Sequence, residues 1–155
     1  MIKEVTSEDL KQAINLVNDV FSEFVALDYS QEGIDTFETY LKSKYDEILN
    51  GLQSGDKKMW AYYQDGEIIG VIATRNISHI SLMFVAKNHH RKGIARKMFL
   101  TVLEELKNYK DITQITVNSS PYAVKTYECL GFLKIGEQQE RNGIIFIPMV
   151  RDNSA

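Results

Sequence analysis

The chain has 155 residues and a formal net charge of -3 at pH 7; 44% of its residues are hydrophobic and 25% are charged. This length suits one ordinary domain, so we expect residues 1–155 to form a single domain around one core. The composition is that of a soluble globular protein, and the slightly acidic balance argues against general nucleic-acid binding.

No apolar run is long enough for a membrane helix, and the N-terminus lacks the layout of a signal peptide. These features predict a cytoplasmic protein with no membrane partner. Cys129 is the only cysteine, so no internal disulfide can form, and we expect it to be a buried small hydrophobe rather than a nucleophile. Three histidines without paired Cys/His spacing predict no metal site.

The first third of the chain predicts a short strand followed by helices. Residues 1–5 have the alternation of a strand, and residues 6–9 supply an N-cap with acidic first-turn residues. Apolar residues at helical spacing then predict a first helix to about residue 24. Ser30 is expected to cap a second helix to about residue 41, which continues or restarts over residues 45–52.

The remaining elements predict a mixed sheet. Residues 59–63 and 68–74 are strands joined by Asp65-Gly66, a strong hairpin signal, and residues 79–85 form a third strand. A helix over residues 93–108 leads to a strand over 112–118, parallel to the third, and then to a helix over 121–130. Strands 132–138 and 144–150 form a closing hairpin. The prediction is an α/β fold of about seven mostly antiparallel strands, a splayed parallel pair at the centre, and about four helices on both faces.

The segment from His79 to Leu106 is the most informative. An apolar strand is followed by a basic turn, by Gly93 and by an amphipathic helix. The free N–H groups at a helix N-terminus, beside cationic side chains, favour phosphate binding. Local chemistry leaves open a second interpretation, a solvated corner without a ligand.

Two motifs carry a resemblance to a known family. The run His90-Arg91-Lys92-Gly93-Ile94-Ala95 resembles the acyl-CoA pyrophosphate loop of the GCN5-related N-acetyltransferase (GNAT) family, whose pattern is Gln/Arg, two residues, Gly, one residue, Gly/Ala. His90 departs from it. Downstream, residues 117–124 and Tyr127-Glu128-Cys129-Leu130-Gly131-Phe132 are similar to the family's second signature. The resemblance is close over about residues 68–132.

The resemblance implies a GNAT-like fold with acetyl-CoA as co-substrate. The main chain of Phe84 and Val85 would bind the pantetheine arm, and the backbone N–H groups that follow His90 would bind the pyrophosphate. The implied cofactor-binding residues are Phe84, Val85, His90, Arg91, Lys92, Gly93, Ile94, Ala95, Arg96, Asn118 and Tyr127.

Two residues are candidates for proton transfer. His79 would be the general base, directly or through water, and period two places it on one face with Ser81, Met83 and Val85. Its alternative role is that of a strand-end histidine making one hydrogen bond. The resemblance implies that Tyr127 protonates the leaving thiolate; its alternative is packing under the helix. The N–H of Val85 is the expected oxyanion donor.

These expectations describe an acetyl-CoA-dependent N-acetyltransferase that acts on a primary amine of a small molecule or peptide by direct attack in a ternary complex. The alternatives are a non-catalytic acyl-CoA-binding regulatory module and a scaffold without a ligand. The apolar edge over residues 144–149 would allow a homodimer. The acceptor pocket is expected from aromatic residues with acids nearby: Phe24, Tyr29, Phe37, Trp60 and Tyr62, with Asp28, Glu32, Glu38 and Glu47.

Overall fold

The computed structural model describes residues 1–43 and 45–153. Its eight-stranded sheet has the order β1-β2-β3-β4-β5-β8-β6, with β7 paired to β8. Neighbouring strands in the described chain are antiparallel except β4 and β5, which are parallel. The strands are β1 (Ile2–Glu4), β2 (Lys57–Gln64), β3 (Glu67–Arg75), β4 (His79–Val85), β5 (Gln114–Ser119), β6 (Leu133–Lys134), β7 (Gln139–Arg141) and β8 (Ile144–Asp152).

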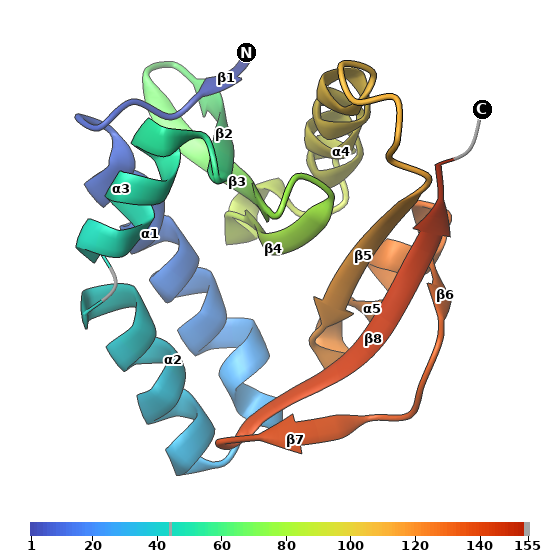
Figure 1. Ribbon diagram of the computed structural model, residues 1–155. Coiled ribbons are helices and arrows are strands. Elements are labelled where there is room, and N and C mark those ends of the chain that lie inside the picture. Colours follow the sequence, from blue (N-terminus) through green and yellow to red (C-terminus); the bar gives the residue numbers. More distant parts are fainter. Residues whose placement is uncertain (44, 154–155) are drawn as a thin grey trace.

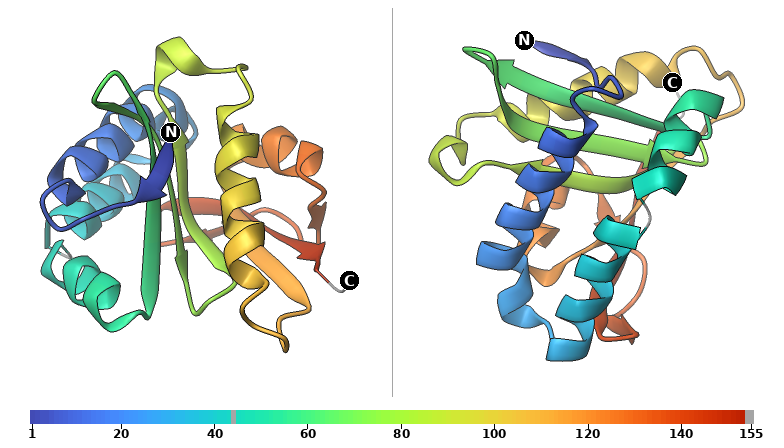
Figure 2. Two further views of the ribbon diagram at one scale, coloured as in Figure 1. Left: turned by 90° about the horizontal axis from the view of Figure 1, so that it is seen from above. Right: turned by 90° about the vertical axis from the view of Figure 1, so that its left-hand side faces the viewer.

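Helices cover both faces of this sheet, as predicted. Figure 1 and Figure 2 show α1, α2 and α3 on one side and α4 and α5 on the other. The α-helices are α1 (Leu10–Val20), α2 (Gln31–Ser43), α3 (Tyr45–Ser54), α4 (Ile94–Leu106) and α5 (Val124–Cys129). Shorter turns are the π-helix η1 (Phe21–Val25) and the 3-10 helices η2 (Ala26–Asp28), η3 (Lys87–His89) and η4 (Pro121–Ala123). No helix of the described chain combines the length and hydropathy needed to span a membrane.

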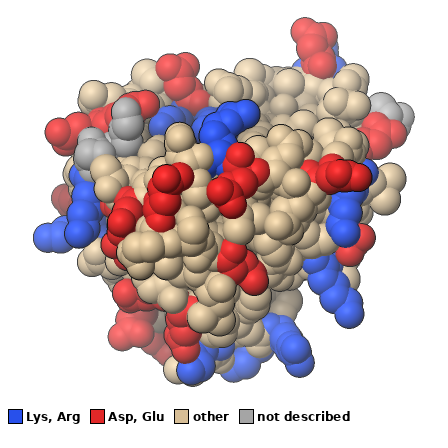
Figure 3. Space-filling model, turned by 90° about the horizontal axis from the view of Figure 1, so that it is seen from below, with Lys and Arg blue, Asp and Glu red and all other residues tan. Residues whose placement is uncertain are grey.

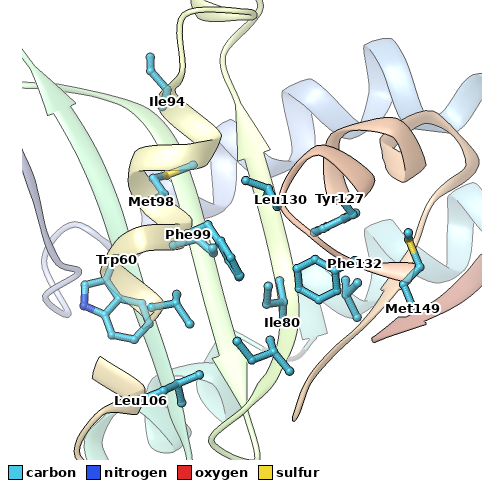
Figure 4. Packing of buried hydrophobic residues seen from close by; sticks show 14 of the residues in the cluster. Trp60, Ile80, Ile94, Met98, Phe99, Leu106, Tyr127, Leu130, Phe132 and Met149 are labelled. Atoms are coloured by element: carbon cyan, nitrogen blue, oxygen red, sulfur yellow. The ribbon is translucent and has the colours of Figure 1, made fainter. Parts of the chain in front are cut away.

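Each face of the sheet has its own apolar core. One core joins α4 and α5 to the sheet, and Figure 4 shows Phe99 and Phe132 near its centre. The ring centroids of these two residues are 5.5 Å apart. The other core joins α1, α2 and α3 to β2, β3 and β4. Each fully buried Leu, Ile or Phe contributes roughly 1.5–3 kcal/mol relative to exposure. Five residues of the predicted apolar stripe of α4 are buried, and Ala95 and Leu103 are half-buried. The buried five are Ile94, Met98, Phe99, Val102 and Leu106.

Two local predictions are confirmed by backbone geometry. Asp65 and Gly66 have φ of 52° and 81°, as a type I′ hairpin turn between β2 and β3 requires. Ser30 caps α2, because its Oγ accepts the N–H of Gly33 at 3.2 Å. The predicted first helix changes character, however, because the chain adopts π geometry from Phe21 to Val25.

The C-terminal region differs from the predicted simple hairpin. The first expected strand is split into the short β6 and β7, and β8 pairs with β5, β6 and β7. The turn between β7 and β8 lies at Asn142 and Gly143, with φ of 54° and 81°. Met149 is therefore paired on both sides, to β5 and to β6, whereas Ile144, Ile145 and Phe146 are paired on one side only, to β7. Part of the expected edge is covered within the chain, and pairing of a dimer through the rest stays a prediction.

Candidate active site

The two parallel strands are joined only at one end. β4 and β5 pair at His79 with Thr116 and at Ile80 with Val117, while β4 stays paired to β3 as far as Val85. β5 stays paired to β8 as far as Ser119. The strands therefore diverge beyond Ile80, and the predicted splay is present as a wedge that opens toward their carboxyl ends (Figure 1).

A bulge in β4 changes which residues face the wedge. Ala73 pairs with Leu82 and Thr74 with Ile80, so Ser81 has no opposite residue. Ile80, Met83 and Val85 pack on the α4 side, whereas Leu82 and Phe84 pack on the α1 side. Our prediction that His79 shares a face with Met83 and Val85 was wrong, because the extra residue inverts the alternation.

The hydrogen bonding of β4 identifies its free backbone groups. The N–H of Ala86 donates to the carbonyl of Ile69 at 2.8 Å, so Ala86 is turned toward β3. The backbone N–H and C=O groups of successive strand residues point to alternate sides. Those of Phe84 therefore also point toward β3, whereas those of Met83 and Val85 point toward the wedge. The expected use of the Phe84 main chain is thus corrected to Met83, while Val85 keeps the predicted orientation.

The loop after β4 presents a row of free amides. In the part of the chain that the structure describes, the N–H groups of residues 91–96 donate to no protein acceptor. The chain turns into α4 through two residues with left-handed backbone conformation, Arg91 with φ of 62° and Gly93 with φ of 77°. A Cβ on Gly93 would meet no atom within 4 Å, so this surface is open. Free amides and a positive dipole end suit a phosphate.

Two stretches of the chain carry charges of one sign. The charged residues between positions 68 and 103 are all basic: Arg75, Lys87, Arg91, Lys92, Arg96 and Lys97. Those between positions 12 and 41 are all acidic: Asp19, Glu23, Asp28, Glu32, Asp35 and Glu38. Figure 3 shows several acidic side chains on the left-hand part of the face seen from below, where α1 to α3 lie in Figure 1, and further acidic side chains at the centre and on the right.

His79 lies at the narrow end of the wedge on the α1 side. Its Nδ1 is 2.8 Å from the Oγ1 of Thr116. Burial, and secondarily the nearby Arg75 cation, lower the pKa of His79 from 6.5 to about 4. The imidazole is therefore neutral at pH 7 and can accept a proton, although it is a weak base.

Tyr127 approaches the wedge from the opposite face. Its ring is buried on α5, edge-on to Phe132 at 5.5 Å (Figure 4), and burial raises the pKa of its hydroxyl. That hydroxyl donates to no other described residue, unlike most buried tyrosines.

Asn118 is exposed on β5, one residue beyond the last β4–β5 pair. Its placement fits the predicted contact with a ligand.

The expected acceptor residues divide between the two faces. Tyr29 and Phe37 pack on Phe21 in the front half, with centroid distances of 5.3 and 4.0 Å, and burial raises the pKa of Tyr29 to about 12. Trp60 and Tyr62 instead belong to the core under α4, so the prediction that they line the same pocket was wrong. Asp28, Glu32 and Glu47 are exposed and Glu38 is half-buried.

Two further residues behave differently from the sequence interpretation. Cys129 is exposed rather than buried, because it follows Tyr127 by two positions on a short helix and points the other way. Met83 was missed as a wedge residue; Ser81, a polar residue inside an apolar strand, was the available signal for the bulge.

Within residues 1–43 and 45–153, no cluster of three His, Cys, Asp or Glu side chains is placed to hold a metal ion.

Similarity to known proteins agrees with this geometry. N-acetylaspartate synthetase of Danio rerio is 30% identical over 88 residues, covering 52% of this chain and 31% of that protein, so this chain spans less than a third of that relative. PaiA N-acetyltransferase of Thermoplasma acidophilum, solved in complex with coenzyme A, has a TM-score of 0.78 at 20% identity over 98% of both chains.

Another similar structure is ribosomal-protein-alanine N-acetyltransferase of Brucella melitensis, with a TM-score of 0.70 at 18% identity over 98% of this chain and 99% of that one. At these identities, the structural likenesses establish the fold. Residues 25–152 match the family described as "Acetyltransferase (GNAT) domain". Because this match covers well over half of the sequence, the chain belongs to the GNAT acetyltransferase family, as its two signatures predicted.

Proposed function

We propose that the protein transfers an acetyl group from acetyl-CoA to a primary amine. The observation that carries this proposal is the row of free N–H groups from Arg91 to Arg96 at the open end of the wedge. A diphosphate placed there would meet several donors at once, and the adjacent Arg91, Lys92 and Arg96 side chains are exposed cations.

The wedge fits the rest of such a cofactor. Met83 and Val85 turn N–H and C=O groups toward it, as the edge of a sheet does for an added strand. An extended pantetheine arm following β4 from the loop would end beside Ile80, where the strands meet. Coenzyme A supplies the activated acetyl thioester, and one of the free N–H groups of Met83 and Val85 would stabilise its carbonyl oxygen.

Two side chains would move the protons. His79, held by Thr116, would accept a proton from the amine on the α1 side of the wedge, directly or through water. Tyr127 would donate its hydroxyl proton to the departing thiolate from the α5 side. Their approach from opposite faces suits direct transfer in a ternary complex, because the amine and the thiol then occupy different sides of the carbonyl.

The acceptor would enter from the acidic front half. An amine is cationic at pH 7, and the acids between Asp19 and Glu38 would attract it over a range of about 8 Å at physiological salt. We propose a primary amine of a small molecule or peptide. The low basicity of His79 also supports a second candidate, an acyl-CoA-binding regulatory module without turnover.

A calorimetric titration with acetyl-CoA, followed by thiol release in the presence of single amines, tests this function. The proposal predicts binding and acceptor-dependent release of one thiol for each acetyl group transferred. Binding without release for small amines, amino acids, polyamines and peptide N-termini would favour the regulatory module. Absence of binding would reject both.

Gly93→Ala is expected to weaken acetyl-CoA binding about ten-fold, or about 1.4 kcal/mol. A methyl group would lie in the open cradle formed by the free amides, although it touches no protein atom. The dissociation constant from calorimetry measures the effect.

Gly66→Ala is the matched control. Gly66 has a φ of 81°, close to the 77° of Gly93, and equally open surroundings. Both variants should lose about 1–2 kcal/mol of stability through left-handed strain, but only Gly93→Ala should weaken binding. Equal affinities of the two variants would contradict the assignment of the cradle.

His79 should give the protein a characteristic pH dependence. Its usual pKa of 6.5 falls to about 4 in the folded protein, so between these values the unfolded chain binds more protons. The free energy of unfolding should therefore fall as pH decreases from about 6.5 to about 4, and His79 should add no pH dependence above that window. Thermal unfolding of wild type and His79→Gln measures this.

The variant should show a flatter stability profile across that window. The rate of acetyl transfer by the wild-type protein should likewise not fall near pH 6.5, because His79 stays neutral down to about pH 4. If His79→Gln retained the wild-type pH dependence of unfolding, the lowered pKa of His79 would be contradicted.

A further inference from the structure

The side chain of His90 occupies a position inside the wedge. Its Nε2 donates to the carbonyl oxygen of Val85 at 2.7 Å. Because the polar groups of Val85 point away from β3 and toward the wedge, the imidazole must lie on the β5 side of β4. An amide of an extended ligand chain following β4 would seek the same carbonyl.

Phe24 continues this contact across the wedge. Its ring centroid is 4.9 Å from that of His90 and 5.5 Å from that of Tyr122, on which it stacks at 27°. His90 follows β4, whereas Tyr122 follows β5. Val85, His90, Phe24 and Tyr122 therefore form a continuous chain of contacts between the two diverging strands, at the end where they are farthest apart.

The π-helix η1 brings Phe24 to this place. The wider π turn at Phe21–Val25 rotates the following side chains relative to α1, and such turns are frequent at functional sites. The neighbouring Glu23 pairs with Lys87 in the loop after β4, with 2.8 Å between Oε1 and Nζ. This pair is exposed and weak, so the aromatic contacts and the His90 hydrogen bond hold the segment.

We propose that Phe24, His90 and Tyr122 form a latch that closes the cofactor wedge and must open before coenzyme A enters. The inference rests on the proposed function, because it assumes that the wedge receives the pantetheine arm. Opening breaks the hydrogen bond from His90 to Val85 and separates Phe24 from its two ring partners. His90 takes the position where the family pattern has Gln or Arg, and the latch gives that departure a role.

The latch makes binding depend on the fraction of molecules that are open. When only a fraction of the protein is competent, both the apparent affinity and the observed association rate fall in proportion to that fraction. Loss of one hydrogen bond or one aromatic contact shifts such an equilibrium by about ten-fold. Variants without the latch should therefore associate with coenzyme A about ten-fold faster than wild type.

Stopped-flow mixing of the full-length protein with fluorophore-labelled coenzyme A measures that rate. His90→Phe removes the Nε2 donor and retains an aromatic ring against Phe24, while Phe24→Leu removes the ring and retains apolar bulk. Each variant should associate about ten-fold faster. Because both weaken the same closed state, the double variant should associate at least as fast as the faster single variant, up to the rate of the fully open protein.

His89→Phe is the matched control. It makes the same substitution one residue earlier, at a half-buried side chain that contacts no ring and forms no side-chain hydrogen bond with any described residue. It should associate at the wild-type rate. Circular dichroism and thermal unfolding establish that each variant is folded, and a second latch variant, Tyr122→Leu, replaces any variant that is not.

Association rates of the folded latch variants within two-fold of wild type, or slower, would overturn the latch. That result would leave the proposed function intact, because wild type would still bind coenzyme A. If neither wild type nor any variant binds coenzyme A, the proposed function is rejected and the latch with it.

Discussion

Tyr127→Phe is expected to lower kcat about 100-fold, within the range contributed by general acids, while the dissociation constant of acetyl-CoA changes less than two-fold. The substitution removes one oxygen from a buried ring and keeps its packing on Phe132. Because burial raises the pKa of this hydroxyl, it stays protonated throughout the usual assay range. Steady-state kinetics with a saturating amine, together with calorimetry, measure both constants.

Tyr63→Phe is an informative control for the same chemical change. Its hydroxyl donates to Oδ2 of Asp9 at 2.8 Å, far from the wedge, so its removal should cost about 1 kcal/mol of stability and leave kcat unchanged. Tyr127→Phe should show the reverse pattern. If its kcat stayed within two-fold of wild type, the role of Tyr127 would be packing alone.

Gly33→Ala is expected to destabilise the protein by about 1–3 kcal/mol or more, because no side chain can move to accept the methyl group. A Cβ on Gly33 would lie 2.0 Å from the carbonyl oxygen of Gly143, so the two backbones are in direct contact. The Thr36 hydroxyl lies at this junction, 2.9 Å from the carbonyl oxygen of Asn142 and 2.8 Å from that of Glu32, and shares its one proton between them. Chemical denaturation monitored by circular dichroism measures the loss.

Gly51→Ala provides the comparison, since both glycines lie within helices. At Gly51 the atoms nearest to the new methyl group all belong to the Lys57 side chain: Cδ at 2.8 Å and Cγ at 2.9 Å, which can rotate away, and Cβ at 3.2 Å. Alanine is also the better helix former by about 1 kcal/mol. This variant should be as stable as wild type or more so. Equal stability of Gly33→Ala and Gly51→Ala would contradict the tight junction between α2 and the β7–β8 turn.

Features with strong local signals were predictable from the sequence. The β2–β3 turn follows from Asp65-Gly66, because those residues tolerate the left-handed backbone that the turn requires. The start of α2 follows from Ser30, and the free amides follow from Gly93 before an amphipathic helix. The wedge was predicted from the resemblance of two motifs to one family.

Features that depend on distant partners were not predictable in this way. The bulge at Ser81 arises from the register between β3 and β4, and it reassigned the wedge-facing groups from Phe84 to Met83. The π turn at Phe24 brings that ring to His90, far along the chain, and the contact between His90 and Val85, which are close in sequence, depends on how the loop after β4 folds back. A single-sequence pattern records none of these pairings, because each is selected by tertiary packing.

The position of β8 has a consequence for biosynthesis. β5 forms one wall of the wedge, and most of its hydrogen bonds go to β8, which follows it in the chain by two short strands and a helix. A nascent chain that has emerged only as far as α5 therefore lacks the partner that keeps β5 extended. At about 5–20 residues per second, translation leaves that wall unsupported for a few seconds, an interval in which chaperones can bind the exposed strand.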